Sequence, residues 1–261
     1  MKIDQFPLLL VTFGTFFIVA LAMEAGYRLG RSAHRKSEDE KESPVSAIAG
    51  AILGLLAFML AFTFSIVSDR YDTRKGLVRE EANAIRTAYA RASFLPEPDR
   101  TQAREMLKSY VDGRVAVVTN QDMDKVASAL TEATRLQDGL WQMAVANARK
   151  DMNSDVAALY VESVNDLCSV HALRVAVGLQ ARIPGGIWIA LYALVVLGMI
   201  SVGYQTAIAA SKRSYAAPIL ALAFTIVLSL IALLDHPQNR LITVSQQPLV
   251  DLRTAMDRPQ P

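Results

Sequence analysis

The sequence SIVSDRYDTRKGLVREEANAIRTAY, residues 65–89, joins an apolar segment that begins near residue 45 to a densely charged one. No proline interrupts residues 45–89, and apolar side chains recur through the charged part at spacings of 7, 4, 3, 4 and 3 residues. They are Tyr71, Val78, Ala82, Ile85, Tyr89 and Ala92. This heptad rhythm predicts one helix that crosses a membrane and continues beyond it as an amphipathic helix to about residue 94, roughly 75 Å in all. The two prolines of LPEPD, residues 95–99, end the helix.

Four apolar windows indicate a multi-pass membrane protein. They cover residues 6–23, 45–67, 183–205 and 215–234 of a chain of 261 residues that is 52% apolar and 20% charged. Each window is long enough to cross a hydrocarbon core of roughly 30 Å. A soluble fold would have to bury four helices of this length completely. The first window lacks a small-x-small cleavage site after Met23, so we interpret it as a retained anchor and not a signal peptide.

The predicted fold is all-α, with four transmembrane helices and an antiparallel four-helix bundle inserted between the second and third. Residues 1–67 form the first hairpin, with a loop at 24–44, and residues 68–182 form the bundle. Further bundle helices are expected at about 99–118, after NQD at 120–122, and from 153–154 until the chain enters the membrane near 183. Residues 183–234 form the second hairpin, and residues 235–261 form a C-terminal tail.

The basic residues give two indications about which side of the membrane the bundle occupies. Both hairpin loops are basic, at Arg28, Arg31, Arg35, Lys36 and Lys41 in the first and at Lys212 and Arg213 in the second. The positive-inside rule then favours cytoplasmic loops and an extracytoplasmic bundle. The membrane end of the bundle is basic as well, at Arg70, Arg74, Lys75 and Arg79, which favours the opposite orientation.

Residues that could carry catalysis or bind a metal are few. The three histidines, at positions 34, 171 and 236, are far apart in the sequence, and we interpret His171 as a packed core histidine. The adjacent Glu80 and Glu81 point about 100° apart on a helix and are expected to form a solvated face. A single cysteine, Cys168, allows no intrachain disulfide. A net charge of +2 gives no reason to expect nucleic acid. We therefore expect no enzyme activity, no catalytic residues, no metal and no cofactor.

The long helix carries two stripes within its membrane segment. Gly50, Gly54, Ala57 and Ala61 recur at steps of 4, 3 and 4 residues, which suits close helix packing, either within one subunit or between subunits. Phe58, Phe62 and Ile66 recur at steps of 4 residues. They either face lipid or form a hydrophobic constriction in a pore.

The block that follows these stripes resembles the signature of a family of bacterial bestrophin-like membrane proteins of unknown function. Its matching residues are Ser68, Arg70, Tyr71, Asp72, Arg74, Glu81, Asn83, Ile85, Tyr89, Arg91, Leu95 and Pro96. The C-terminal part is similar to the family's ending at Asp235, Pro237, Val244, Ser245, Pro248 and Leu249. Arg240 stands where the family's pattern has glycine, so a different turn is expected there.

The resemblance implies an ion pathway. Bestrophins are homopentameric anion channels with four spans and an apolar pore neck along the second span, to which Phe58, Phe62 and Ile66 would correspond. It follows that the partners are the lipid bilayer, other copies of the chain and small anions, in a bacterial inner membrane. Arg70, Arg74 and Lys75 would concentrate anions at the pore mouth. The alternative is a non-conducting sensor or scaffold whose bundle binds a ligand or partner.

Overall fold

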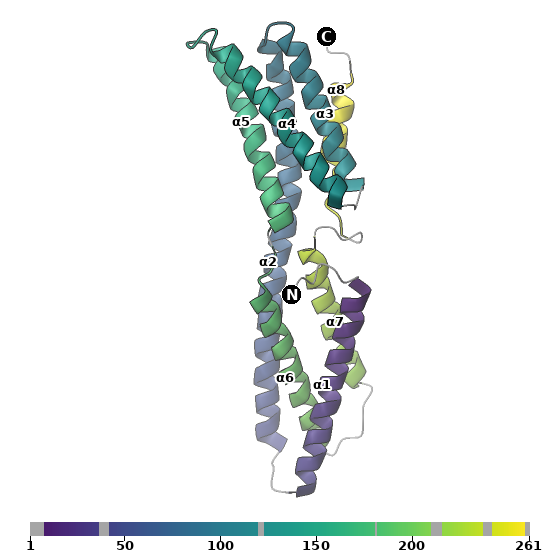
Figure 1. The fold of residues 1–261 in the computed structure, drawn as a ribbon. Helices are drawn as coiled ribbons and strands as arrows, with labels where there is room; N and C mark the ends of the chain where they lie inside the picture. The colour runs from purple at the N-terminus through teal and green to yellow at the C-terminus, as the bar shows by residue number, and fades with distance from the viewer. Residues whose placement is uncertain are drawn as a thin grey trace. The chain divides into compact units, whose positions relative to one another are not determined.

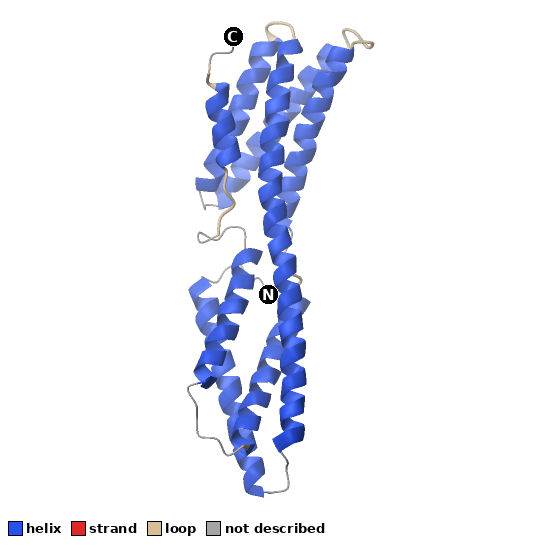
Figure 2. Ribbon diagram, turned by 180° about the vertical axis from the view of Figure 1, so that it is seen from behind, coloured by secondary structure: helices blue, strands red, loops and turns tan. Residues whose placement is uncertain are grey.

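The computed structural model of the chain describes residues 8–36, 42–119, 123–180, 182–209, 216–236 and 242–258. Its helices are α1 (Leu8–Lys36), α2 (Glu42–Arg91), α3 (Asp99–Thr119), α4 (Met123–Ala148), α5 (Asp155–Val175), α6 (Gly185–Ile208), α7 (Ala216–Asp235) and α8 (Gln247–Met256) (Figure 1). Every regular element among the described residues is helical (Figure 2), and four of the helices are long and apolar enough to span a membrane. The all-α fold class with four spans is therefore confirmed.

The helices divide into two compact units. A membrane unit comprises Met1–Arg70 and Arg182–Ile242, and a bundle unit comprises Tyr71–Ala181 and Thr243–Pro261. Helix α2 contributes to both, as the unbroken rhythm around residues 65–89 predicted. The second hairpin loop, the turn at 120–122, Lys41, Pro237 and Arg240 lie outside the described residues.

In the membrane unit, α1 packs closely along α6 through glycines. A Cβ added at Gly26 would collide with the backbone of Ile200, and one added at Gly203 would collide with the backbone of Met23. At Gly30 the added Cβ would lie 2.6 Å from the Tyr204 carbonyl oxygen. The prediction of a loop at 24–44 is consequently wrong for most of its length, since α1 continues to Lys36 and α2 begins at Glu42. Gly26 and Gly30 of α1 do not form a turn; they allow the backbones of α1 and α6 to approach.

The C-terminal end of α5 also differs from the prediction of a helix that runs to the membrane. Helix α5 begins after Ser154, whose side chain accepts a hydrogen bond from the Ala157 amide, and ends at Val175. A π-helical stretch, Ala176–Gln180, follows, and Pro184 then caps α6. Because proline lacks an amide hydrogen, it suits the start of a helix and not its interior.

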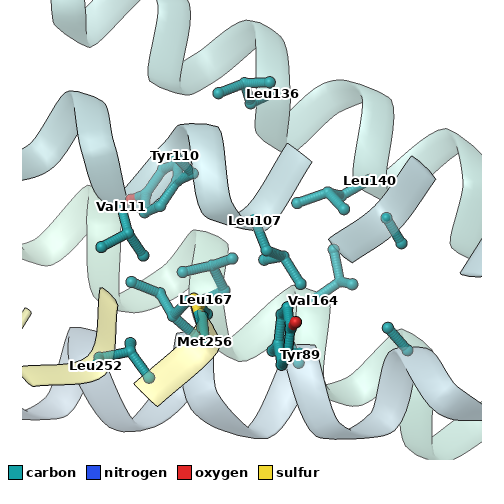
Figure 3. Packing of buried hydrophobic residues seen from close by; sticks show 14 of the residues in the cluster. Tyr89, Leu107, Tyr110, Val111, Leu136, Leu140, Val164, Leu167, Leu252 and Met256 are labelled. Carbon is teal, nitrogen blue, oxygen red and sulfur yellow. The ribbon is translucent and has the colours of Figure 1, made fainter. Parts of the chain in front are cut away.

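The bundle unit has a single hydrophobic core to which α2, α3, α4, α5 and α8 contribute (Figure 3). Ala82 and Ile85 are buried in it, at 2% and 0% exposure, which confirms the predicted seam of α2. Burying a side chain of the size of isoleucine contributes about 1.5–3 kcal/mol. The periodicity of α2 thus identified the correct buried face.

Helix α8 lies in the segment that was expected to be a tail. Leu249, Leu252 and Met256 are 0%, 2% and 5% exposed and join the bundle core. Figure 3 shows Leu252 and Met256 in this core. On the exposed side, Arg253 Nε donates to Asp112 Oδ1 of α3 at 2.5 Å. The bundle therefore contains a C-terminal helix in addition to the predicted four.

Candidate functional site

The exposed surface of α2 in the membrane unit carries the candidate pore residues. Phe58 and Phe62 are 65% and 57% exposed, and their rings stack with centroids 6.3 Å apart and planes 15° apart. Ile66, one further turn along, is half-buried. The opposite face of α2 is buried and includes Leu56, which contacts the α6 surface at Gly198. The structure therefore leaves the phenylalanine stripe, Phe58, Phe62 and Ile66, available to a neighbour, to lipid or to a pore.

The small-residue stripe, Gly50, Gly54, Ala57 and Ala61, is exposed beside the phenylalanine stripe. A Cβ added at Gly50 or Gly54 would meet no atom of the described chain within 4 Å, which argues against packing on a helix of the same subunit. The same repeating steps of 4, 3 and 4 residues continue along α2. They include small residues at Ser65, Ser68, Gly76 and Ala90 and larger polar residues at Asp72, Arg79, Asn83 and Thr87. An 11-residue period corresponds to 3.67 residues per turn, so these residues stay on nearly one face of the helix.

Two of the three basic residues expected at a pore mouth, Arg70 and Arg74, are partly or fully buried. The Arg74 side chain is buried, at 9% exposure, and Arg70 Nη1 lies 3.7 Å from Asp235 Oδ1. Asp235 is itself buried and also accepts a hydrogen bond from the Ile183 amide at 3.0 Å, where the chain enters α6. Of the three proposed residues only Lys75 is exposed, and their role in concentrating anions stays a prediction.

The remaining signature residues of the bundle unit have separate environments. Tyr71 is half-buried, and Asp72 and Asn83 are exposed. Tyr89 is 9% exposed, and the Arg104 guanidinium lies 5.2 Å from its ring centroid, a distance typical of a cation–π contact. These residues do not form one site.

The second candidate site is a buried polar cluster in the bundle unit. Its members come from α2, α3, α4 and α5, and they are Glu81, Tyr110, Arg114, Gln137, His171 and Arg174. Tyr110 Oη donates to Glu81 Oε1 at 2.7 Å, and Arg174 Nη1 donates to Glu81 Oε2. Arg114 Nε lies 3.1 Å from Glu81 Oε1. A single carboxylate that is 0% exposed thus joins three helices.

The hydrogen bonds around the Tyr110 hydroxyl fix the tautomer of His171. The Tyr110 phenol has one hydrogen to donate. It donates this hydrogen bond to the Glu81 carboxylate, because an ionised carboxylate can only accept hydrogen bonds. Tyr110 Oη then accepts from Gln137 Nε2 at 3.3 Å and from His171 Nδ1, which is 2.7 Å away. His171 is accordingly assigned as the Nδ1–H tautomer.

The ionisation of the cluster follows from its burial. Burial, reinforced by the positive charge of Arg114, lowers the pKa of His171 to about 4. Burial lowers the pKa of Arg174 to about 10 and also lowers the pKa of Arg114. Burial raises the pKa of the Tyr110 phenol well above its usual range. At neutral pH, His171 and Tyr110 are therefore neutral while both arginines are charged.

The cluster reaches the C-terminal segment as well. Arg174 Nη2 donates to Gln246 Oε1 at 2.5 Å, and Gln246 Nε2 donates to the Val244 carbonyl at 2.9 Å just before α8. No group of histidine, cysteine and carboxylate side chains that could hold a metal occurs among the described residues. The arrangement is suited to tying segments together by charge-assisted hydrogen bonds.

A protein-family model for a bestrophin-like domain matches residues 16–249. The chain belongs to the bestrophin-like family. Among solved structures, a crystal structure of a bacterial bestrophin homologue from Klebsiella pneumoniae is similar over 96% of this chain and 96% of its own, at 14% identity and a TM-score of 0.63. A point variant of that homologue covers 95% of this chain and 97% of its own, at 14% identity and a TM-score of 0.61. A point variant described as a membrane protein covers 95% of both chains, at 14% identity and a TM-score of 0.62.

No curated protein matches the chain. At this level of sequence identity, the structural likeness establishes the fold alone. The family match and the fold confirm the resemblance drawn from the signature block, and they make this bestrophin-like chain a multi-pass membrane protein.

The polar cluster of this bestrophin-like protein corrects one prediction and confirms another. Glu81 was expected on a solvated face and is completely buried, whereas the adjacent Glu80 is exposed. The signal that identifies Glu81 is its position three residues after Val78 and four before Ile85, both on the buried seam. His171 is a hydrogen-bonded core histidine, as predicted, with 6% exposure.

Proposed function

We propose that the protein forms a homo-oligomeric ion pore in the bacterial inner membrane, lined by α2. The observation that carries the proposal is that α2 presents two adjacent, unpartnered stripes in its membrane segment. The small-residue stripe suits close contact with a helix of a neighbouring subunit. The phenylalanine stripe then faces the axis, where apolar side chains gate by dewetting. The kinship with bestrophins, which are channels, also supports a channel and not an enzyme.

The identity of the ion rests on the family and not on the charges of α2. The exposed charged residues that follow the phenylalanine stripe balance, with Asp69, Asp72 and Glu80 against Lys75, Arg79 and Arg86. Because neither sign dominates, we propose small anions on the basis of bestrophins. Reversal potentials in a salt gradient test this choice separately from conduction itself.

The gate is tested by flux through liposomes that contain the purified protein. Replacing Phe58, Phe62 and Ile66 with alanine should widen the constriction and raise ion flux. The matched control is Phe13→Ala with Phe17→Ala on α1, because these two rings are 61% and 60% exposed. Equal flux from the control and the triple variant would refute the assignment of the gate.

The subunit contact is tested by Gly54→Leu. A leucine at this position separates the helix backbones, so the oligomer observed in mild detergent should dissociate. Leu55→Ala on the neighbouring surface of α2 should leave the oligomer intact. An unchanged oligomer in Gly54→Leu would place the subunit contact on another surface.

A non-conducting sensor or scaffold is the second candidate, and one cavity favours it. A cavity of about 300 Å³ lies between α3 and α4 in the bundle unit. Its polar lining includes Ser109, Tyr110, Ser128 and Glu132. An intact oligomer in which wild type and triple variant both conduct neither anions nor cations would favour this function.

We further propose that the bundle lies outside the cytoplasm, on the basis of the basic residues in the hairpins. A cysteine placed at exposed Asp124 in a Cys168→Ser background reports on this orientation. An impermeant maleimide should label it in intact cells. Labelling that occurs only after lysis would reverse the orientation.

A further inference from the structure

The polar cluster has more positive than negative charge. Two guanidinium groups, Arg114 and Arg174, contact one carboxylate, Glu81, so the three groups together carry a net charge of +1. His171 and Tyr110 are neutral and do not change this sum. Their neighbours Gln137 and Gln246 are uncharged amides. A buried charge without a counter-charge is strongly unfavourable, which makes the excess at this position notable.

Arg114 is the arginine of the cluster that has an unsatisfied donor, its Nε. Its side chain is 8% exposed, and its buried Nε has no hydrogen-bond partner among the described residues, although Glu81 Oε1 lies 3.1 Å away. The oxygens of Glu81 already accept from Tyr110 and Arg174. Arg174, in contrast, directs its two terminal nitrogens at Glu81 and Gln246. The excess charge and the unsatisfied donor therefore coincide at Arg114.

We propose that the polar cluster is a binding site for one small monovalent anion of about the size of chloride, held against the Arg114 guanidinium. A single negative charge brings the cluster to neutrality and accepts from the unsatisfied donor. Two features select this class of ligand. A divalent anion would leave the buried cluster with a net charge of −1, next to the Glu81 carboxylate. The burial of the cluster also excludes a bulky organic anion.

The anion adds an electrostatic contact between the positive charges of Arg114 on α3 and Arg174 on α5, so its binding stabilises the folded bundle. Ligand that binds only the folded state, at ten times its Kd, multiplies the ratio of folded to unfolded protein about elevenfold. This role is independent of conduction, because it belongs to the bundle unit and requires no pore.

The test is thermal unfolding of the full-length protein in mild detergent, with sodium bromide exchanged for sodium gluconate at constant ionic strength. The melting temperature should rise with bromide and saturate. Arg114→Gln removes the excess charge and should abolish the saturable rise. Arg253→Gln, at a surface ion pair with Asp112, should keep it. The phenylalanine-stripe alanine variant should keep it as well, which separates this site from an anion in a pore.

A wild-type protein whose melting temperature does not depend on bromide would overturn the proposal, as would an equal rise in Arg114→Gln. If Arg114→Gln does not fold, crystals of the wild type grown in bromide decide the matter. An anomalous difference peak beside the Arg114 guanidinium is expected, and its absence at saturating bromide would refute the site.

Discussion

Acidification should destabilise the bundle through His171, and the size of the effect follows from its environment. The side chain is almost completely buried beside Tyr110, and burial followed by the charge of Arg114 lowers its pKa from 6.5 to about 4. The unfolded chain therefore binds a proton below about pH 6.5, whereas the folded chain does not bind one until about pH 4. The contribution of neutral His171 to the free energy of unfolding is fully present above pH 6.5. It falls as the pH drops towards 4, by about 3 kcal/mol in total.

The measurement is the free energy of chemical unfolding in detergent at a series of pH values between 7.5 and 4. Because carboxylates also titrate in this range, the comparison is between wild type and His171→Asn, whose amide nitrogen can replace Nδ1 but does not titrate. On acidification the free energy of unfolding of the wild type should fall relative to that of His171→Asn by about 3 kcal/mol, because only the wild type loses this contribution. His34→Asn, on α1, is the matched control and should follow the wild type. Parallel curves for wild type and His171→Asn would refute the reasoning.

The long helix could be predicted because its information is local. Between residues 45 and 92 the chain has no proline, and the buried positions recur with a helical period even where the composition changes from apolar to charged. Ala82, Ile85 and Tyr89 are buried as that period requires. A change of solvent from lipid to water altered the composition of the exposed face without ending the helix.

The polar cluster could not be predicted in the same way because its partners are distant in the sequence. Tyr110, Arg114 and Arg174 reach Glu81 from two other helices, and composition favours a solvated position for any single carboxylate. Periodicity placed position 81 on the buried face, but only the tertiary structure supplies the donors that make a buried carboxylate tolerable. The extent of α1 was missed for a related reason, since a glycine that permits close helix contact is indistinguishable from a turn glycine without the partner helix.

The remaining predictions concern three different contacts. Glu81→Gln leaves both arginines of the cluster without a carboxylate and should lower the free energy of unfolding by about 3–5 kcal/mol, whereas Glu80→Gln, at the exposed neighbour, should leave it nearly unchanged. Gly203→Ala inserts a methyl group against a backbone carbonyl of α1 and should cost about 1–3 kcal/mol or more, seen as a lower melting temperature. The last tests whether α8 belongs to the folded bundle. Leu249 is 0% exposed in the core, so Leu249→Ala should lower the free energy of chemical unfolding by about 2–5 kcal/mol. The adjacent Val250, 38% exposed, provides the control, and equal stabilities of the two alanine variants would show that α8 does not contribute to the core.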